Sequence, residues 1–333
     1  MADRHDALPR VLVTLPYPDP GPRLLREACD ATVWEDPLPL PRADLLRLLP
    51  EVEGVMATIF DRLDREALDR APKLRAISCF GVGYDYVDVP AATERGIVVC
   101  NTPGVLAECV ADHAFALLLA VGRRLAEHRA YAREGRLVEV QVTPALYGRE
   151  IGGATLGIIG LGAIGTGVAR RARGFAMRVI YTGRTRKPEV EAETGAEWAS
   201  LDDLLRQADY VSIHTALTPE TRGLIGAREL ALMKPSAVLV NTARGPIVDT
   251  EALTEALRDG RLFGAGLDVT DPEPLPRDHP LLSLENALIA PHTGSAGVQT
   301  RARMSELAAR NLIDALAGRR PRHLVNSEAW RDR

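Results

Sequence analysis

The sequence predicts an α/β protein with two doubly wound parallel-sheet domains, one inserted in the other. Short β-rich runs alternate with helical patterns over the first hundred residues, and a second alternating series begins at Ala154. Alternation of this kind is typical of parallel sheets with helices on both faces. The length of 333 residues is typical of two domains rather than one. A late helix after the last strand is expected to return to the first domain, which makes that domain discontinuous.

The first series contains four expected strands and three expected helices. The strands are expected at residues 10–15, 31–35, 54–60 and 74–79, and the helices at 22–29, 42–49 and 64–70. A long helix is expected next, at about 105–133, because Pro103 and Gly104 interrupt the chain before it. Residues 114–121 are apolar almost all round this helix, which predicts burial between layers or against a second subunit. Residues 137–150 are expected to form an irregular arm.

The second series contains six expected strands, with helices between most of them. The strands are expected at residues 154–160, 177–182, 210–214, 237–241, 264–269 and 287–290. The last helix is expected at about 296–317, because Gly318 and Pro321 follow it and are typical of a helix end. We therefore expect one domain from residues 1–102 with 293–333, and the other from residues 103–292.

The composition is typical of a globular protein that binds neither nucleic acid nor a membrane. The net charge is −4 with both signs mixed, so no nucleic-acid surface is indicated. The longest apolar run, residues 114–121, is far too short to cross a bilayer, and the first ten residues have no apolar core of a signal peptide. The four cysteines show no CxxC spacing. We expect a cytoplasmic protein with reduced thiols and no metal site.

The strongest local motif is glycine-rich and lies where a strand pattern meets a helical one. Gly160, Gly162 and Gly165 form G-x-G-x-x-G within TLGIIGLGAIGTGVARRA. The first glycine permits a tight turn, the second lets the backbone approach a pyrophosphate, and the third lets the helix lie close to the strand. In this context the motif predicts a dinucleotide-binding Rossmann domain. The alternative is a tight turn that binds no ligand.

The residues after the next strand indicate which dinucleotide is bound. An acidic residue is expected there if NAD is the cofactor, because a carboxylate binds the ribose 2′-hydroxyl. In MRVIYTGRTRK this position is Gly183. The basic loop that follows is Arg184, Thr185, Arg186 and Lys187. Guanidinium groups bind a 2′-phosphate well, so the loop favours NADPH. The alternatives are a solvated basic loop, or NAD bound through one of the acids just beyond, Glu189, Glu191 or Glu193.

Three later segments place charged or titratable residues at strand ends, where open α/β sheets bind ligands. Arg244 lies in NTARGPIVD, Glu273 in a proline-rich loop after Asp268, and His292 in LIAPHTGSA. Arginine suits the carboxylate and carbonyl of a 2-oxo acid, and histidine suits proton donation near neutral pH. A carboxylate hydrogen-bonded to the imidazole favours its protonated form. Each residue alone is typical of a surface or structural position, but together, downstream of a dinucleotide motif, they favour hydride transfer.

The chain resembles the D-isomer-specific 2-hydroxyacid dehydrogenases over nearly its whole length. The matching stretches, in order, are FGVGYDYVDVPAATERGI, NTPGVLAE, TLGIIGLGAIG, LTPETRGLI, LVNTARGPIVD, GAGLDVTDPEP and PHTGSA. The resemblance implies a Rossmann cofactor domain inserted in a flavodoxin-like substrate domain. It also implies a homodimer formed through the long helix after NTPG and the arm beyond it.

The resemblance implies a role for each matching residue. Arg244 would bind the substrate carboxylate and carbonyl, His292 would be the acid/base, and Glu273 would pair with His292. The backbone N–H groups of Val82 and Gly83 would bind the substrate carboxylate. The cofactor-contact positions, besides the three glycines, are Ala163, Ile164, Arg184, Thr185, Arg186, Ala216, Thr242, Asp268 and Gly294. We interpret His113, on the apolar helix, as a structural histidine, and we assign no chemistry to His214.

Within the family, YTGR and DVTDPEPLPRDHPLL are most similar to NADPH-linked glyoxylate/hydroxypyruvate reductases. Many of those enzymes carry tryptophans in the arm, where this chain has Leu137 and Val140. The difference favours a pocket for a different or larger 2-oxo acid. Two alternatives stay open. One is an NAD(H)-linked dehydrogenase of a bulkier or aromatic 2-oxo acid, and the other is a non-enzymatic, corepressor-like sensor of NAD(P)H.

Overall fold

The computed structural model describes residues 8–136 and 144–330 and divides the chain into two compact units. The first unit comprises the chain up to Leu106 and the chain from Ala296 onward, and the second comprises Ala107–Ser295. The assignment of residues 1–102 and 293–333 to a substrate domain, and of residues 103–292 to a cofactor domain, stays a prediction. Among the described residues, no helix is both long and apolar enough to cross a membrane.

The first unit contains one parallel sheet of five strands. Its strands are β1 (Arg10–Val13), β2 (Asp30–Val33), β3 (Gly54–Ala57), β4 (Ala76–Cys79) and β5 (Val98–Cys100). The strand order is β2-β1-β3-β4-β5, which is the order of flavodoxin-like sheets. The helices are α1 (Gly21–Ala28), α2 (Arg42–Leu48), α3 (Arg65–Asp69), α4 (Val89–Glu94) and α12 (Val298–Leu316).

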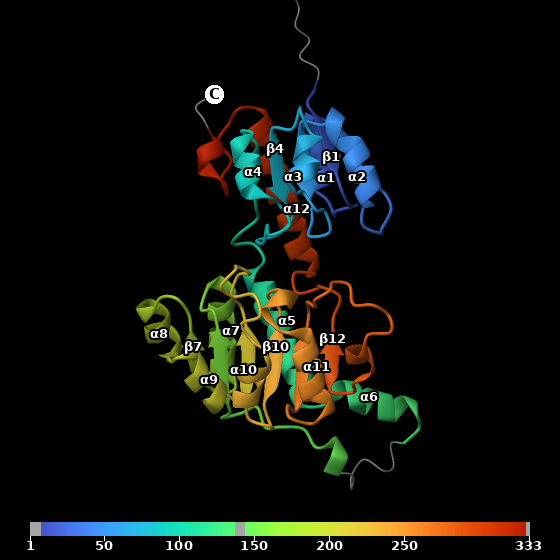
Figure 1. The fold of residues 1–333 in the computed structure, drawn as a ribbon. Helices are drawn as coiled ribbons and strands as arrows, with labels where there is room; N and C mark the ends of the chain where they lie inside the picture. The colour runs from blue at the N-terminus through green and yellow to red at the C-terminus, as the bar shows by residue number, and fades with distance from the viewer. Residues whose placement is uncertain (1–7, 137–143, 331–333) are drawn as a thin grey trace, which may run out of the picture. The chain divides into compact units, whose positions relative to one another are not determined.

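The late helix α12 packs on the first sheet, as the sequence predicts. It contacts α1 and strands β3 and β4 (Figure 1). The hydroxyl of Ser78 in β4 donates to the carbonyl of Ala308 in α12 at 2.8 Å. On the opposite face, an apolar core joins the sheet to α2, α3 and α4. The chain therefore leaves this unit once and comes back to complete it.

The second unit contains one parallel sheet of seven strands. Its strands are β6 (Thr155–Ile159), β7 (Arg178–Thr182), β8 (Glu197–Trp198), β9 (Tyr210–Ile213), β10 (Val238–Asn241), β11 (Gly264–Leu267) and β12 (Ala287–Ile289). The order is β12-β11-β10-β9-β6-β7-β8. Read from the first strand of this unit, it is the Rossmann order with a seventh strand added. The prediction of two doubly wound parallel-sheet domains is confirmed.

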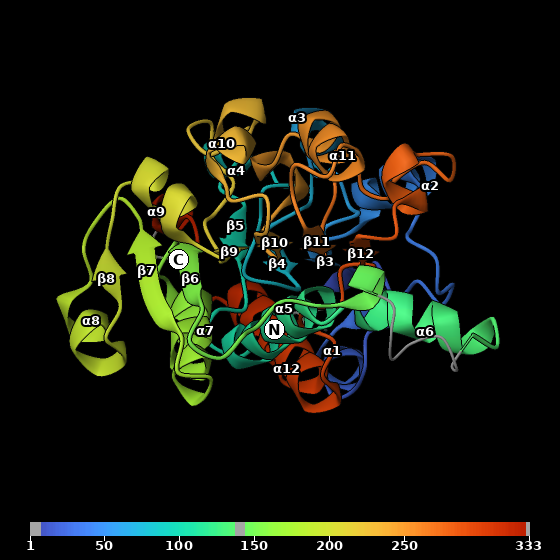
Figure 2. The ribbon, with the colours of Figure 1, turned by 90° about the horizontal axis from the view of Figure 1, so that it is seen from below.

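Helices cover both faces of the second sheet. They are α5 (Ala107–Gly122), α6 (Leu125–Arg133), α7 (Ala163–Gly174), α8 (Pro188–Thr194), α9 (Leu201–Gln207), α10 (Ala227–Leu232) and α11 (Thr250–Arg258). Figure 2 shows α10 and α11 on one side of the strands and α5 and α7 on the other. Strand residues alternate between the two cores: Leu239 packs with α11, whereas Val238 and Val240 pack with α5. Because all seven strands are parallel, their carboxyl ends meet at one edge, where loops can carry a site.

The helix expected over residues 105–133 is wrong as a single element, because it is two helices. Arg124, between α5 and α6, has a left-handed backbone with φ 54°. The carbonyl of Gly122 accepts the amide of Arg149 at 2.7 Å, so it does not continue the helical ladder. Gly122 also lies against Tyr210, where a Cβ would come within 2.7 Å of the hydroxyl oxygen. The apolar part of the pattern, α5, is buried on β10 and β11.

Candidate active site

The glycine-rich turn follows β6 and opens α7. Gly160 has φ 96°, and a Cβ there would come within 2.8 Å of the amide nitrogen of Thr215. A Cβ on Gly165 would come within 2.2 Å of the carbonyl oxygen of Gly160. Around Gly162, by contrast, a Cβ would meet no atom within 4 Å. The outer two glycines therefore make the turn compact, while the middle one leaves the backbone open at a helix N-terminus. This arrangement fits a dinucleotide pyrophosphate.

The basic loop follows the neighbouring strand, β7. Arg184, Thr185 and Arg186 are exposed. Arg186 forms a two-point ion pair with Glu191 in α8: Nε to Oε1 at 3.1 Å and Nη2 to Oε2 at 2.7 Å. The hydroxyl of Tyr181 also donates to Oε1 of Glu191 at 2.5 Å. The two predicted arginines therefore differ, because Arg186 already has a carboxylate partner.

Arg244 lies in a turn just after β10. The side chain of Asn241, which is buried, holds this turn on both sides. Its Oδ1 accepts the amide of Ala243 at 3.0 Å, and its Nδ2 donates to the carbonyl of Arg244 at 2.9 Å. Nη1 of Arg244 donates to the carbonyl of Ala243 at 2.8 Å. Arg244 as a whole is half-buried. The backbone that carries the cation is thus fixed by a buried amide that sequence reasoning missed.

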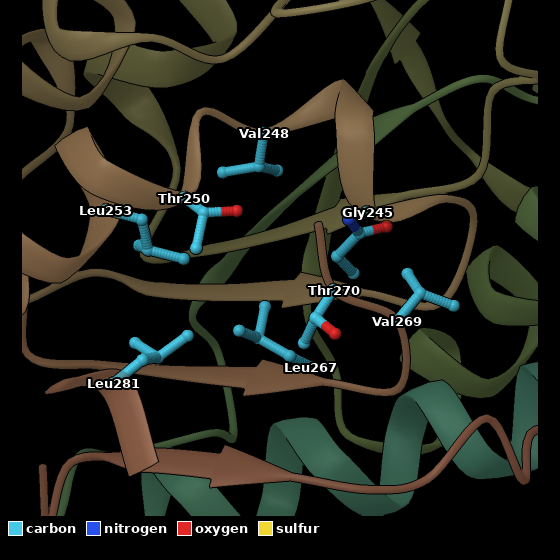
Figure 3. Close-up of a pocket in the computed structure, with 9 residues that line it drawn as sticks. Gly245, Val248, Thr250, Leu253, Leu267, Val269, Thr270 and Leu281 are labelled. Carbon is cyan, nitrogen blue, oxygen red and sulfur yellow. The ribbon is translucent and has the colours of Figure 1, made fainter. Parts of the chain in front are cut away.

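The residue after Arg244 brings two functional loops together. A Cβ on Gly245 would come within 1.9 Å of the carbonyl oxygen of Thr270, so only glycine fits. Thr270 begins the loop that carries Glu273. The small pocket in Figure 3 lies between these two turns. It is lined by Asn241, Gly245, Val248, Thr250, Leu253, Leu267, Val269, Thr270 and Leu281. Neither Arg244 nor Glu273 lines it, so we do not place a substrate there.

Glu273 and His292 meet, as predicted. Nδ1 of His292 lies 2.6 Å from Oε1 of Glu273, and their side chains are 25% and 23% exposed, Glu273 first. His292 has a left-handed backbone with φ 53°, and its amide donates to the carbonyls of Asp268 and Ala290. A histidine held in this uncommon conformation, with one ring nitrogen bonded to a carboxylate, has a fixed ring orientation. The second ring nitrogen, Nε2, is the one available for proton transfer.

Asp268 supports the loop that follows His292. Its carboxylate is 2% exposed and accepts the amides of Thr293 at 2.6 Å and Gly294 at 2.7 Å. Nε2 of His113, in α5, lies 3.2 Å from Oδ1 of Asp268. Burial raises the pKa of Asp268, but the His113 side chain and the two amides outweigh this, so the pKa lies below its usual range. His113 thus contacts a buried carboxylate through Nε2, which is consistent with a structural role.

The other predicted cofactor positions also follow strand ends. Ala163 and Ile164 form the first turn of α7. Ala216 follows β9, and Thr242 follows β10 and is buried. Nδ1 of His214 lies 3.4 Å from the Thr242 hydroxyl. Burial lowers the pKa of His214 to about 3, so this ring is neutral near pH 7.

The site residues of the second unit form a row along one edge of its sheet. His292 follows β12, Asp268 follows β11, Arg244 follows β10, Gly160 follows β6, and Arg184 follows β7. All these strands are parallel, so their carboxyl ends lie on the same edge. In this order, His292 and Arg244 lie toward one end, the glycine turn at the switch between β9 and β6, and the basic loop toward the other end. This arrangement fits a dinucleotide whose pyrophosphate lies at the glycine turn.

The predicted carboxylate-binding loop lies in the first unit. Val82 and Gly83 follow β4, in a loop fixed by two bonds: Nδ2 of Asn101 donates to the carbonyl of Val82, and the amide of Thr102 donates to the carbonyl of Gly81, both at 2.8 Å. Within residues 8–136 and 144–330, no hydrogen bond uses the N–H groups of Val82 or Gly83. Those two donors can bind an anion.

Two further sequence predictions concern the arm and metal binding. Leu137 and Val140 lie outside the described residues. Over the part of the chain that the structure describes, no group of three or more His, Cys, Asp or Glu side chains is arranged to hold a metal ion.

Known proteins are similar to this chain in sequence and in fold. Residues 115–294 match the family model "D-isomer specific 2-hydroxyacid dehydrogenase, NAD binding domain". A glyoxylate reductase from Thermococcus litoralis is 46% identical over 96% of this chain and 97% of its own length. A structure from Thermus thermophilus has a TM-score of 0.88 and 52% identity, covering 95% of this chain and all of its own.

A second solved structure has a more informative name. It is an NADPH-dependent glyoxylate/hydroxypyruvate reductase from Sinorhizobium meliloti, in complex with NADP and malonate. Its TM-score is 0.85 at 35% identity, with 98% of this chain and 99% of that chain covered. The resemblance found in the sequence is therefore confirmed, and this chain belongs to the D-isomer-specific 2-hydroxyacid dehydrogenase family.

Proposed function

We propose that the protein is an NADPH-linked reductase that converts a small 2-oxo acid, of the glyoxylate or hydroxypyruvate type, to the D-2-hydroxy acid. The observation that carries the proposal is the 2.6 Å contact between Nδ1 of His292 and Oε1 of Glu273, on the sheet edge that also carries the glycine turn. The glyoxylate reductases among the relatives support the substrate class. The name of the Sinorhizobium meliloti reductase supports both the cofactor and the substrate class.

Arg244 is the proposed electrophile. Reduction of a 2-oxo acid adds a hydride to the carbonyl carbon and a proton to the carbonyl oxygen. The nicotinamide cofactor, when bound, supplies the hydride. A guanidinium fork matches a carboxylate and keeps its positive charge at any working pH. Arg244 therefore binds the substrate carboxylate and stabilises the negative charge that develops on the carbonyl oxygen.

His292 is the proposed proton donor. As the new C–H bond forms, the electron pair of the C=O π bond moves onto oxygen, and the proton on Nε2 of His292 is transferred there. Glu273 keeps the ring in place through Nδ1 and stabilises its positive charge before the transfer. In the reverse direction the same nitrogen takes the hydroxyl proton.

The first unit contributes the proposed carboxylate donors. The N–H groups of Val82 and Gly83 have no internal partner among the described residues, and their loop is fixed by Asn101 and Thr102. Two adjacent backbone donors of this kind bind an anionic carboxylate without adding a charged side chain. These backbone donors also fix the position of the carboxylate, because they cannot move as a flexible side chain can.

The proposed cofactor site uses the row of residues at the sheet edge. Gly160, Gly162 and Gly165 hold the pyrophosphate, and Arg184 binds the 2′-phosphate. The remaining proposed contacts are Ala163, Ile164, Thr185, Arg186, Ala216, Thr242, Asp268 and Gly294. The preference for NADPH rests on the absence of an acidic residue directly after β7, where Gly183 and Arg184 follow Thr182.

A panel of 2-oxo acids tests the proposal most directly. Glyoxylate, hydroxypyruvate, pyruvate and phenylpyruvate would each be assayed with NADPH and with NADH. The proposal expects the highest kcat/KM for a small substrate with NADPH, and a chiral assay of the glycerate formed from hydroxypyruvate should give the D-isomer. A higher kcat/KM for phenylpyruvate with NADH would favour the NAD-linked alternative. Tight NADPH binding without turnover of any 2-oxo acid would favour the sensor.

We also propose a cytoplasmic homodimer. None of the residues of α6 is buried against the described part of the chain, and Leu125 at its start is 53% exposed. An exposed helix of this kind is suited to contact with a second copy. Light scattering coupled to size-exclusion chromatography checks the mass, and Leu125→Glu is expected to lower it from a dimer to a monomer. An unchanged mass in Leu125→Glu would exclude α6 from the interface.

A further inference from the structure

The basic loop after β7 is joined to α8 by a set of charged contacts that the proposed function does not use. Both oxygens of Glu191 accept from the guanidinium of Arg186, and one of them also accepts the Tyr181 hydroxyl. The same hydroxyl accepts the amide of Lys187 at 2.8 Å. We call these four residues, Tyr181, Arg186, Lys187 and Glu191, the loop clamp.

The clamp has a rigid part and an exposed part. Tyr181 is fully buried, and the Glu191 side chain is only 16% exposed. The Arg186 side chain is 64% exposed. The Arg186 guanidinium and the Tyr181 hydroxyl hold the pKa of Glu191 below its usual range, so this group is a carboxylate near neutral pH. The acid is thus fixed in place, whereas the arginine can leave it at small cost.

We propose that Glu191 weakens the preference for NADPH by competing with its 2′-phosphate for Arg186. The inference rests on the proposed function in one respect, namely that the loop after β7 faces the adenosine ribose. A guanidinium forms a two-point contact with one carboxylate or one phosphate at a time. Arg186 must therefore give up Glu191 to bind the phosphate. Arg184 is the arginine that the clamp leaves out, and it is the main phosphate ligand.

Replacement of Glu191 is expected to raise the affinity for a 2′-phosphorylated ligand for two reasons. Replacing Glu191 by glutamine removes the competitor, so Arg186 meets the phosphate without losing a partner. The change also removes one negative charge close to the phosphate dianion. Glutamine has the same shape and can still accept the Tyr181 hydroxyl, so the loop keeps its support. Both effects tighten binding of a 2′-phosphorylated ligand, and they act much less on a ligand with a free 2′-hydroxyl, whose phosphate lies farther away.

The test measures binding of two cofactor fragments to the full-length protein by calorimetry, which needs no turnover. The probes are 2′,5′-ADP, which carries the 2′-phosphate, and 5′-AMP, which lacks it. Glu191→Gln is expected to tighten 2′,5′-ADP by roughly two- to fivefold and to leave 5′-AMP unchanged. The matched control is Glu189→Gln, which removes the same charge from an exposed position of the same helix. It is expected to change 2′,5′-ADP binding by less.

A double variant identifies the arginine responsible. In Glu191→Gln/Arg186→Gln, the gain in 2′,5′-ADP affinity is expected to disappear. An unchanged or weaker affinity in Glu191→Gln, or an equal gain in Glu189→Gln, would overturn the inference. The cofactor proposal fails separately, if the unmodified protein binds 2′,5′-ADP no more tightly than 5′-AMP. If Glu191→Gln then binds 2′,5′-ADP more tightly than 5′-AMP, the competition between Glu191 and the 2′-phosphate is still supported. If Glu191→Gln also binds the two probes equally, both the cofactor proposal and the competition are contradicted.

Discussion

Two parts of the same sheet edge are held in contrasting ways. Around Arg244, Asp268 and His292, the chain is fixed by buried side chains, by amide donors and by a backbone contact that only Gly245 permits. The loop after β7 is exposed and is held by the ion pair between Arg186 and Glu191. The proposed chemistry thus lies where geometry is fixed, and the proposed cofactor selectivity lies where partners can exchange. Four substitutions test this difference between the two regions.

The largest effect is expected at His292. Because the ring supplies the proton in the proposed step, His292→Ala is expected to lower kcat with glyoxylate by roughly a hundredfold to ten-thousandfold. Stopped-flow or steady-state assays with NADPH measure this loss. Binding of 2′,5′-ADP serves as the control, and it is expected to stay as in the unmodified protein. Full activity in His292→Ala would remove the acid/base role.

The second largest effect is expected at Gly245, in the fixed region around Arg244. Gly245→Ala places a Cβ within 1.9 Å of the Thr270 carbonyl oxygen, so the two loops must separate. We expect a loss of roughly 1–3 kcal/mol in the free energy of unfolding, with a fall in kcat/KM. Gly174→Ala is the control, since a Cβ there meets no atom within 4 Å. Equal unfolding free energies for the two variants would show that the close contact is not required.

A smaller effect is expected at Arg184, in the exposed loop after β7. Arg184→Ala is expected to raise the KM for NADPH by roughly tenfold or more, because a hydrogen-bonded charge pair with the 2′-phosphate is lost. The KM for NADH is expected to change little, and kcat should stay nearly constant with both cofactors. Equal changes in the two KM values would count against a phosphate contact at this residue.

The smallest effect is expected at His113. The lowered pKa of Asp268 means that its carboxylate stabilises the folded state above its ordinary pKa of 3.8, and that this contribution is lost as pH falls through the lower folded value. His113→Leu removes a major cause of the lowering. It is therefore expected to reduce Tm by a few degrees at about pH 7, with a gap that narrows in acid.

His113→Gln provides the control for that experiment. Glutamine keeps a nitrogen donor for Asp268, so it is expected to restore part of the lost Tm. A gap between His113→Leu and the unmodified protein that stays constant from neutral pH to about pH 3 would point to lost packing rather than to the charge.

Periodic patterns and glycine motifs predict most of the fold. Six strands of the second unit and the return of α12 follow from repeated apolar runs and helix-end residues, which are local signals. Strands β5 and β8 escape prediction, because three and two residues are too short to establish an alternating pattern. The break at Arg124 escapes it as well, because it depends on a bond from Arg149, far along the chain, to Gly122.

The site divides in the same way. Glu273 and His292 can be paired from the sequence, because each follows a strand in a recognisable segment, and the structure brings them to 2.6 Å. The residues that hold the site in place cannot be predicted from the sequence. Asn241 is one residue of an apolar strand, and its two bonds to the Arg244 turn depend on how the backbone curves after it. The partner of Arg186 is equally hidden, since the sequence suggests Glu191 only as a possible ribose ligand.

Strand β8 contains a natural fluorescent probe, Trp198. Trp198 pairs with Tyr181, the buried residue of the loop clamp. The chain has two other tryptophans, Trp34 and Trp330, and both belong to the first unit. A variant with phenylalanine at those two positions would emit from Trp198 alone. Its fluorescence would then follow events at the adenosine end of the proposed cofactor site separately from those at the nicotinamide end.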